Sequence, residues 1–218
     1  MSDSVVFQSA RAQRDLLAAR VVSARELLDA HLVQIRRYNP AVNAVITMDE
    51  SQAYTVADTV DRLRAYGVTQ GVLAGLPMVH KDLTAVKGMR FTSGSPIYAD
   101  RIAEEDSHIV RRMKHAGCVT IGKSNVPEFG AGSQTFNPIF GATTNPHHLQ
   151  KTCGGSSGGA AVALACRMVA LADGSDMGGS LRNPGNFNNV VGLRPSVGLV
   201  PSSPNVLPFI GFSVNGPL

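Results

Sequence analysis

The chain has 218 residues, of which 44% are hydrophobic, so it can bury a substantial core and is neither disordered nor fibrous. Its formal net charge of +4 comes from thinly spread basic residues, with Arg36-Arg37 and Arg111-Arg112 among the densest groups and no aromatic residues between them. This pattern argues against nucleic-acid binding.

Cysteine usage and apolar segments exclude further classes of protein. Cys118, Cys153 and Cys166 form an odd set without CxxC spacing, so neither a disulfide framework nor a metal site is expected. The N-terminus lacks a secretory pattern, and the longest apolar stretch, around 160–166, is too short to span a bilayer. We therefore expect a cytoplasmic protein that does not associate with membranes.

The first 66 residues predict a helical N-terminal region. Ser23-Ala-Arg-Glu26 has the form of a capping box, in which the two side chains satisfy backbone N–H groups at a helix start. The helix should continue to about Tyr38, where Asn39-Pro40 is expected to end it. A short β-like run over 44–47 then leads to a second helix over 50–65.

Residues 67–218 predict an α/β core. A strand over 75–80 should end at Lys81-Asp82, a helix should run from Ser107 to Gly117, and a second strand is expected over 118–121. This alternation of strand, helix and strand is typical of the α/β class, in which chemistry often takes place at strand ends.

The later part of this core combines a long loop with small-residue turns. Residues 129–155 show no sustained period and predict a loop, which at this length is usually functional. A tightly packed helix over 156–167 and a strand over 168–172 should follow, and then a glycine-rich turn over 174–180.

Two glycine and serine segments are unusual enough to indicate a catalytic site. They are Gly154-Gly-Ser-Ser-Gly-Gly159 and Gly174-Ser-Asp-Met-Gly-Gly-Ser-Leu-Arg182. A nucleophilic serine needs an adjacent base and backbone N–H donors for the oxyanion, and a turn with Gly178-Gly179 can direct several N–H groups inward. Either segment alone could be only a flexible turn.

Together these segments resemble the signature of the amidase signature family. The resemblance is supported by GLPMVHKD, GKSNVPEFG and FGATTNP upstream and by VVGLRPSVGLVP downstream, and it covers roughly residues 25–218. It implies an α/β fold with a mixed central β-sheet covered by helices on both faces. It also implies an enzyme that hydrolyses carboxylic amides, and related esters, without a cofactor.

The resemblance implies a role for each catalytic residue. Ser180 would be the nucleophile that forms the acyl-enzyme, Ser156 the bridging serine after a cis peptide bond from Gly155, and Lys81 the base. Lys81 must be neutral to act, and burial would lower its pKa from about 10.4. Without the serine motifs, Lys81-Asp82 would be interpreted as an ordinary surface pair.

The same resemblance implies the remaining parts of the site. The backbone N–H groups expected to line the oxyanion hole are those of Met177, Gly178, Gly179 and Ser180. The residues expected to line the acyl pocket are Gly130, Ala131 and Gly132. Asp176 and Arg182 are expected to brace the turn rather than to transfer protons.

The chain is about half as long as members of that family, and it stops at Leu218 inside a segment that normally continues. We therefore expect a catalytic core over 67–218 that is truncated at its C-terminus. The expected partner is either the remaining C-terminal half or a second copy of the chain. The expected substrate is a small-molecule amide.

Three other interpretations are left open. An α/β-hydrolase would need a strand directly before its G-x-S-x-G elbow, and the irregular residues 145–153 argue against one. The glutaminase subunit of a tRNA-dependent amidotransferase usually carries an acidic residue where Pro127 stands. A non-catalytic fragment or binding module is weakened because all three catalytic positions are filled.

Overall fold

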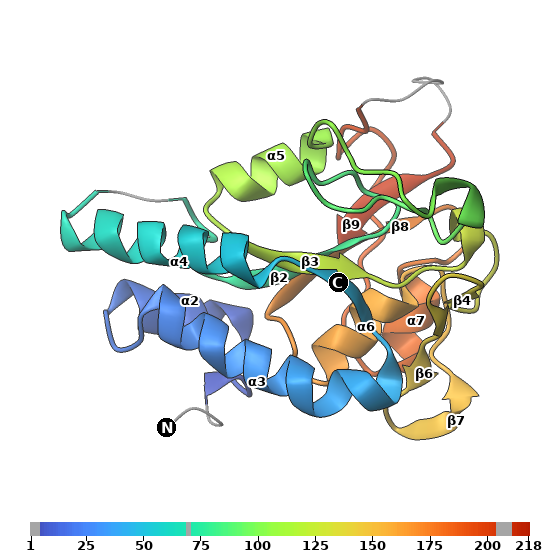
Figure 1. Cartoon of the computed structure of the whole chain (residues 1–218), viewed down its shortest axis with the longest axis horizontal. Coiled ribbons are helices and arrows are strands. Elements are labelled where there is room, and N and C mark those ends of the chain that lie inside the picture. Colours follow the sequence, from blue (N-terminus) through green and yellow to red (C-terminus); the bar gives the residue numbers. More distant parts are fainter. Residues whose placement is uncertain (1–4, 69–70, 204–210) are drawn as a thin grey trace.

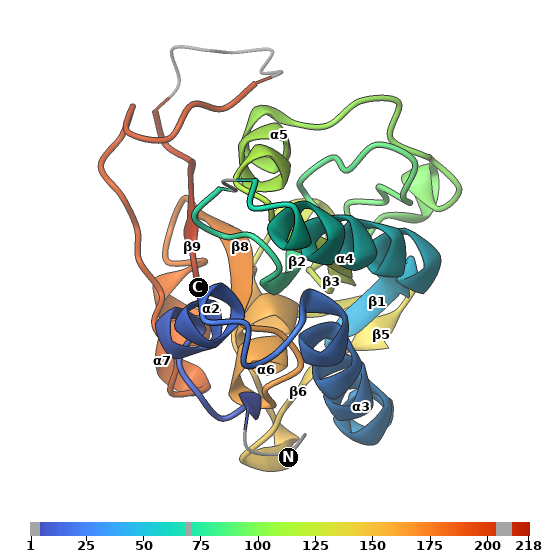
Figure 2. The same ribbon diagram turned by 90° about the vertical axis from the view of Figure 1, so that its left-hand side faces the viewer.

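The computed structural model describes residues 5–68, 71–203 and 211–218. Its centre is a five-stranded sheet with the strand order β1-β3-β2-β8-β9 (Figures 1 and 2). These strands are β1 (Val45–Met48), β2 (Pro77–Lys81), β3 (Val119–Ser124), β8 (Leu171–Asp176) and β9 (Val214–Pro217). The three central strands are parallel and the outer two are antiparallel to their neighbours, which confirms the mixed sheet.

Helices cover both faces of this sheet, as expected. They are α2 (Ala10–Ala18), α3 (Ala24–Val42), α4 (Glu50–Ala65), α5 (His108–His115), α6 (Gly158–Ala165) and α7 (Arg182–Phe187). Figures 1 and 2 show α5 on one side of the sheet and α3 and α6 on the other. In α6, a side chain at Gly159 would collide with the backbones of Ala44 and Asn125, which explains why this helix needs small residues.

The N-terminal helices share one core with the sheet. Leu28 and Leu32 of α3 belong to the same buried cluster as Val79 of β2 and Ala161 of α6. The region over 1–66 also supplies β1, so its described residues form a layer on the sheet rather than a core of their own. No helix in the described ranges is long and apolar enough to cross a membrane.

The first long helix extends further than predicted. The capping box forms, but α3 passes through Pro40 instead of ending before it. Pro40 is exposed and lies in the last turn, where its missing N–H costs only one hydrogen bond at the surface. The Asn39 side chain holds the exit of the helix by accepting hydrogen bonds from the N–H groups of Ala44 and Val45.

Residues 129–155 contain short strands, so the prediction of a structureless loop is wrong. The strands form two hairpins, β4 (Phe136–Asn137) with β5 (Gly141–Ala142), and β6 (Thr144–Asn145) with β7 (His148–Thr152). Strands of two residues are too short to leave a periodic pattern. Side-chain amides hold them instead, since Asn137 Nδ2 donates to Asn125 Oδ1 at 2.7 Å.

The strand predicted over 168–172 is displaced towards the C-terminus. The chain reverses after α6, where the Met168 N–H donates to the Ala163 carbonyl, and β8 begins only at Leu171. Residues 174–176 also lie in this strand and pair with β9, although the glycine-rich turn was predicted to begin at Gly174. The glycine-rich turn therefore starts after Asp176.

Candidate active site

Three segments that are distant in the sequence meet at one end of the sheet. Lys81 is the last residue of β2, Ser156 precedes α6, and Ser180 lies in the turn between β8 and α7. The peptide bond between Gly155 and Ser156 is cis, as the resemblance implied. The Ser157 N–H donates to the Ser180 carbonyl at 3.2 Å, which holds the turn after β8 beside the start of α6.

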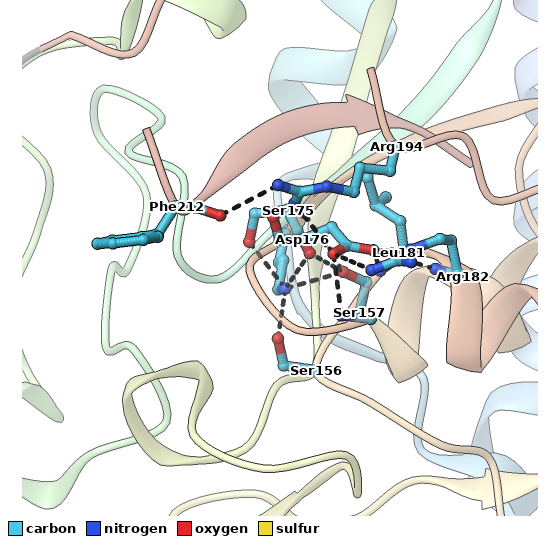
Figure 3. Close-up of polar contacts among 10 residues, drawn as sticks. Ser156, Ser157, Ser175, Asp176, Leu181, Arg182, Arg194 and Phe212 are labelled. Carbon is cyan, nitrogen blue, oxygen red and sulfur yellow. Dashed lines mark hydrogen bonds and ion pairs between the residues drawn. The ribbon is translucent and has the colours of Figure 1, made fainter. Parts of the chain in front are cut away.

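The Lys81 amine lies among three serine hydroxyls. Its Nζ is 2.8 Å from Ser156 Oγ, 2.8 Å from Ser157 Oγ and 3.0 Å from Ser175 Oγ. Figure 3 shows these serines grouped around one nitrogen. An ammonium would donate to all three hydroxyls, whereas a neutral amine donates two hydrogen bonds and can accept one from the third hydroxyl. The arrangement therefore suits either protonation state.

Burial controls the charge of this amine. The Lys81 side chain is fully buried, and burial lowers its pKa to about 7, although the negative charges of Asp173 and Asp176 oppose the change. A large share of the amine is consequently neutral near neutral pH. Lys81 thus meets the electrostatic requirement for a base that accepts a proton from Ser156.

The Ser180 side chain is not part of this hydrogen-bond network. It is half-buried, and its hydroxyl makes no hydrogen bond to the residues that the structure describes. The geometry therefore links Lys81 to Ser156 by a hydrogen bond but does not link Ser156 to Ser180. The role of Ser180 as nucleophile stays a prediction, supported by the position of its turn against Ser157.

Asp176 holds the turn that carries Ser180. Its carboxylate accepts hydrogen bonds from the N–H groups of Gly179 at 2.9 Å and Leu181 at 3.1 Å, and it pairs with Arg182 and Arg194 (Figure 3). Burial raises the pKa of this carboxyl, but the hydrogen bonds from Arg182, Leu181 and Gly179 outweigh burial and hold the pKa below its usual range. Asp176 and Arg182 accordingly brace the turn.

The N–H groups expected in the oxyanion hole are not equivalent. That of Gly179 already donates to Asp176, so in this structure it is not available to a substrate. Met177 and Gly178 are exposed, and their N–H groups bond to nothing in the described part of the chain. Met177 and Gly178, with the Ser180 N–H beside them, are therefore the available donors.

The segment expected to line the acyl pocket borders Ser156 at one end. A Cβ at Gly130 would lie 2.6 Å from Leu83 Cδ1 and 3.6 Å from Ser156 Oγ, so a glycine keeps this approach open. Ala131 and Gly132 are exposed, and a Cβ at Gly132 would meet nothing within 4 Å. Gly130 therefore lies nearest Ser156, and the other two residues lie towards the surface.

Sequence reasoning missed three residues around Lys81. Ser157 follows Ser156 in GGSSGG, where only the first serine was given a role. Asp173 and Ser175 lie at alternate positions of β8, and this alternation was the signal that could have found them. No group of three His, Cys, Asp or Glu side chains that could hold a metal occurs among the described residues.

Comparison with known proteins gives the class of the molecule. A bacterial aryl acylamidase of the amidase signature family shares the fold with a TM-score of 0.91 and 32% identity, over 97% of this chain and 44% of that one. A peptide amidase from Stenotrophomonas maltophilia has a TM-score of 0.87 and 30% identity, over 97% of this chain and 45% of that one. Both of these structures are described as amidases, and this chain shares their fold. A family model described as Amidase matches residues 26–218, and the chain belongs to the amidase signature family.

Curated relatives are similar over most of this chain but are much longer. A glutamyl-tRNA(Gln) amidotransferase subunit from Azoarcus sp. (strain BH72) is 44% identical over 187 residues, which cover 86% of this chain and 38% of that protein. The corresponding subunit from Moorella thermoacetica is 43% identical over 186 residues, which cover 85% of this chain and 38% of that protein. The chain thus spans about two fifths of the length of these relatives.

Proposed function

We propose that this chain carries the catalytic centre of an amidase that hydrolyses carboxylic amides through an acyl-enzyme on Ser180. The observation that carries the proposal is the 2.8 Å hydrogen bond between Lys81 Nζ and Ser156 Oγ, in a fully buried setting that lowers the pKa of Lys81 to about 7. Ser156 bridges the nucleophile and the base. Rotation of the Ser180 side chain towards Ser156 would complete this path.

The proposed reaction moves one proton along the three side chains. Ser180 Oγ attacks the carbonyl carbon while its proton passes to Ser156, and the Ser156 proton passes to Lys81. The carbon–nitrogen bond then breaks, and the leaving amine takes up the proton that Lys81 held. Water attacks the resulting ester by the same route and releases the carboxylic acid. The N–H groups of Met177 and Gly178 would stabilise the oxyanion.

Cleavage of the glutamine side-chain amide is the second candidate. It is favoured by the 44% identity to a protein named as part of a glutamyl-tRNA(Gln) amidotransferase, and it would give this chain partner subunits. The same acyl-enzyme would form, and ammonia would leave. Pro127, at a position that is usually acidic in the glutaminase subunit, favours the stand-alone amidase.

Covalent labelling tests the nucleophile. The 218-residue chain is incubated with a fluorophosphonate, and mass spectrometry of the intact chain measures the adduct. One adduct, mapped to Ser180, is expected; Ser180→Ala should gain none, and Ser51→Ala, which changes an exposed serine of α4, should react like the wild type. An adduct on another serine, or undiminished labelling of Ser180→Ala, contradicts the assignment.

A substrate panel separates the two candidates. Amine release from aryl and linear amides is compared with ammonia release from glutamine, with Ser180→Ala as the blank for each. Preference for aryl or linear amides supports the stand-alone amidase, and preference for glutamine supports the second candidate. A chain that neither reacts with the probe nor turns over any substrate would be a non-catalytic fragment.

A further inference from the structure

Strands β2 and β8 separate just before Lys81. Their ladder pairs Met78 with Leu171 and Val79 with Ala172, and it ends there. Beyond this point the Asp173 carboxylate accepts the backbone N–H of Lys81 at 2.7 Å. A charged side chain thus takes an N–H that a backbone carbonyl would accept in a continuous ladder.

The second oxygen of this carboxylate meets a buried histidine. Asp173 Oδ2 lies 3.2 Å from His80 Nδ1, and His80 Nε2 lies 3.1 Å from Thr120 Oγ1. The His80 and Asp173 side chains are 0% and 3% exposed. These contacts join β3, β2 and β8 directly behind the residue that carries the amine. A buried network of this kind is favourable only when its polar atoms have partners, as they do here.

The His80 and Lys81 side chains leave β2 towards different sides of the sheet, although the amine at the strand end also reaches Ser175 Oγ of β8. Successive residues of a strand point to opposite faces, so His80 and Lys81 diverge. Asp173 borders a cavity of about 560 Å³ together with Ile109 of α5, whereas the Lys81 amine contacts Ser157 at the start of α6. The pair therefore acts on Lys81 through its backbone and through charge.

We propose that Asp173 and His80 form a positioning pair for Lys81, which fixes the separation of β2 from β8 and presents a buried negative charge to the amine. This inference rests on the proposed role of Lys81 as the base. Burial lowers the pKa of Lys81, and the charge of Asp173 opposes burial. Loss of that charge would lower the pKa further and make Lys81 a weaker base.

Other charged groups surround the pair. The titratable and charged groups that face it from neighbouring elements are Cys118 and Lys123 on β3 and His108 and Arg112 on α5, whereas Asp176 of β8 acts on the Lys81 amine. Asp176 is already bonded to Arg182 and to backbone N–H groups. Neutralising Asp173 should therefore change the electrostatic field at Lys81 and disturb the turn that carries Ser180 less than neutralising Asp176 would.

The test measures the titration of Lys81 itself. The chain contains five lysines, so NMR of lysine labelled with ¹³C at Cε gives few signals. The signal that is missing in Lys81→Met is that of Lys81. Asp173→Asn keeps an oxygen that can accept the Lys81 N–H but removes the charge. It should lower the midpoint of the Lys81 titration by about one pH unit, a tenfold weaker affinity for the proton. The matched control, Asp82→Asn combined with Lys123→Met, removes a buried carboxylate together with its cation and should leave that midpoint nearly unchanged.

An unchanged midpoint in Asp173→Asn would overturn the proposal. If this variant does not fold, Asp173→Ser removes the same charge with a smaller side chain. Failure of both variants to fold would also overturn the proposal, because the pair would then serve the fold alone.

Labelling of Ser180 provides a separate readout. His80→Asn keeps a donor for Asp173 and should react within about threefold of the wild type, whereas His80→Ala should react at least about tenfold more slowly. Equal rates for both histidine variants would count against the pair. A wild-type chain that fails to label contradicts the proposed function, and the lysine titration still decides the role of Asp173.

Discussion

Two buried lysines on neighbouring parallel strands have contrasting surroundings. Lys81 and Lys123 are both 0% exposed, but the Lys81 amine meets three serine hydroxyls whereas the Lys123 amine lies 2.9 Å from the Asp82 carboxylate. Burial lowers the pKa of both amines, and at Lys123 the adjacent Asp82 opposes burial directly. Hydroxyl partners leave a buried lysine able to exchange protons, and a contacting carboxylate favours its charged form.

The Lys123 pair attaches a loop to the sheet. Asp82 follows β2, and its second oxygen accepts hydrogen bonds from Thr92 Oγ1 at 2.5 Å and from the Thr92 N–H at 3.2 Å. The pair thereby fastens the chain after Lys81 to β3 and to the segment around Thr92. The ion pair of Lys123 with Asp82 thus stabilises the end of β2, where Lys81 lies.

Lys81→Met should have the largest effect on activity. Methionine nearly preserves the length of the side chain but removes the base, so labelling of Ser180 should fall at least about a thousandfold. The fold should persist, because the Ser157 hydroxyl also lies 3.3 Å from the Ser175 carbonyl and keeps a partner there. Intact-mass labelling and circular dichroism measure the two effects, and labelling within tenfold of the wild type would contradict a role as base.

Lys123→Met should act on stability instead. It leaves the buried Asp82 carboxylate without its cation, which typically costs about 3–5 kcal/mol. Urea unfolding measures the loss, and Lys123→Met combined with Asp82→Asn should recover part of it because neither charge then remains. A Lys123→Met chain as stable as the wild type would remove the distinction between the two lysines.

The pH dependence of labelling sharpens the same comparison. Lys81 must be unprotonated to accept a proton, so the rate should rise through pH 7 and fall about tenfold for each unit below it. Because the unfolded chain binds this proton up to about pH 10.5, Lys81 also makes stability fall as pH drops from there to about 7. A labelling rate that does not change between pH 5 and 9 would rule out Lys81 as the base.

The sequence predicted the contact between Lys81 and Ser156 because the family motifs fix residue type and spacing. It did not predict Asp173 or Ser175 beside them. The glycine and serine residues from 174 onwards predicted a turn, but pairing with β9 makes residues 174–176 part of a strand. A partner far along the chain overrides local preference, as is usual for strands.

The directions of the backbone N–H groups in the turn after β8 also could not be predicted from the sequence. The glycines of the turn indicated that N–H groups could point inward, but they did not indicate which groups. The Asp176 carboxylate decides this by binding the Gly179 N–H, and its own position depends on Arg182 and Arg194. Donor availability in the turn is therefore a property of the folded site rather than of its glycine content.

Ser175→Ala probes the smallest expected difference, the contribution of a third hydroxyl to the Lys81 site. Ser175 Oγ is 3.0 Å from the amine, and the Ser175 carbonyl, at 3.4 Å, would remain as an acceptor. Loss of one hydrogen bond of about 1 kcal/mol should slow labelling of Ser180 by about three- to tenfold.

A matched control for this variant is Ser124→Ala. Ser124 is a buried serine of β3 whose hydroxyl has no hydrogen-bond partner within the described residues, so its loss should leave the labelling rate unchanged. Wild-type labelling by Ser175→Ala would mean that two hydroxyls suffice for Lys81. A loss beyond a hundredfold would instead make Ser175 as important to proton transfer as Ser156, and the contrast with Lys123 would then depend on β8 as much as on the GGSSGG segment.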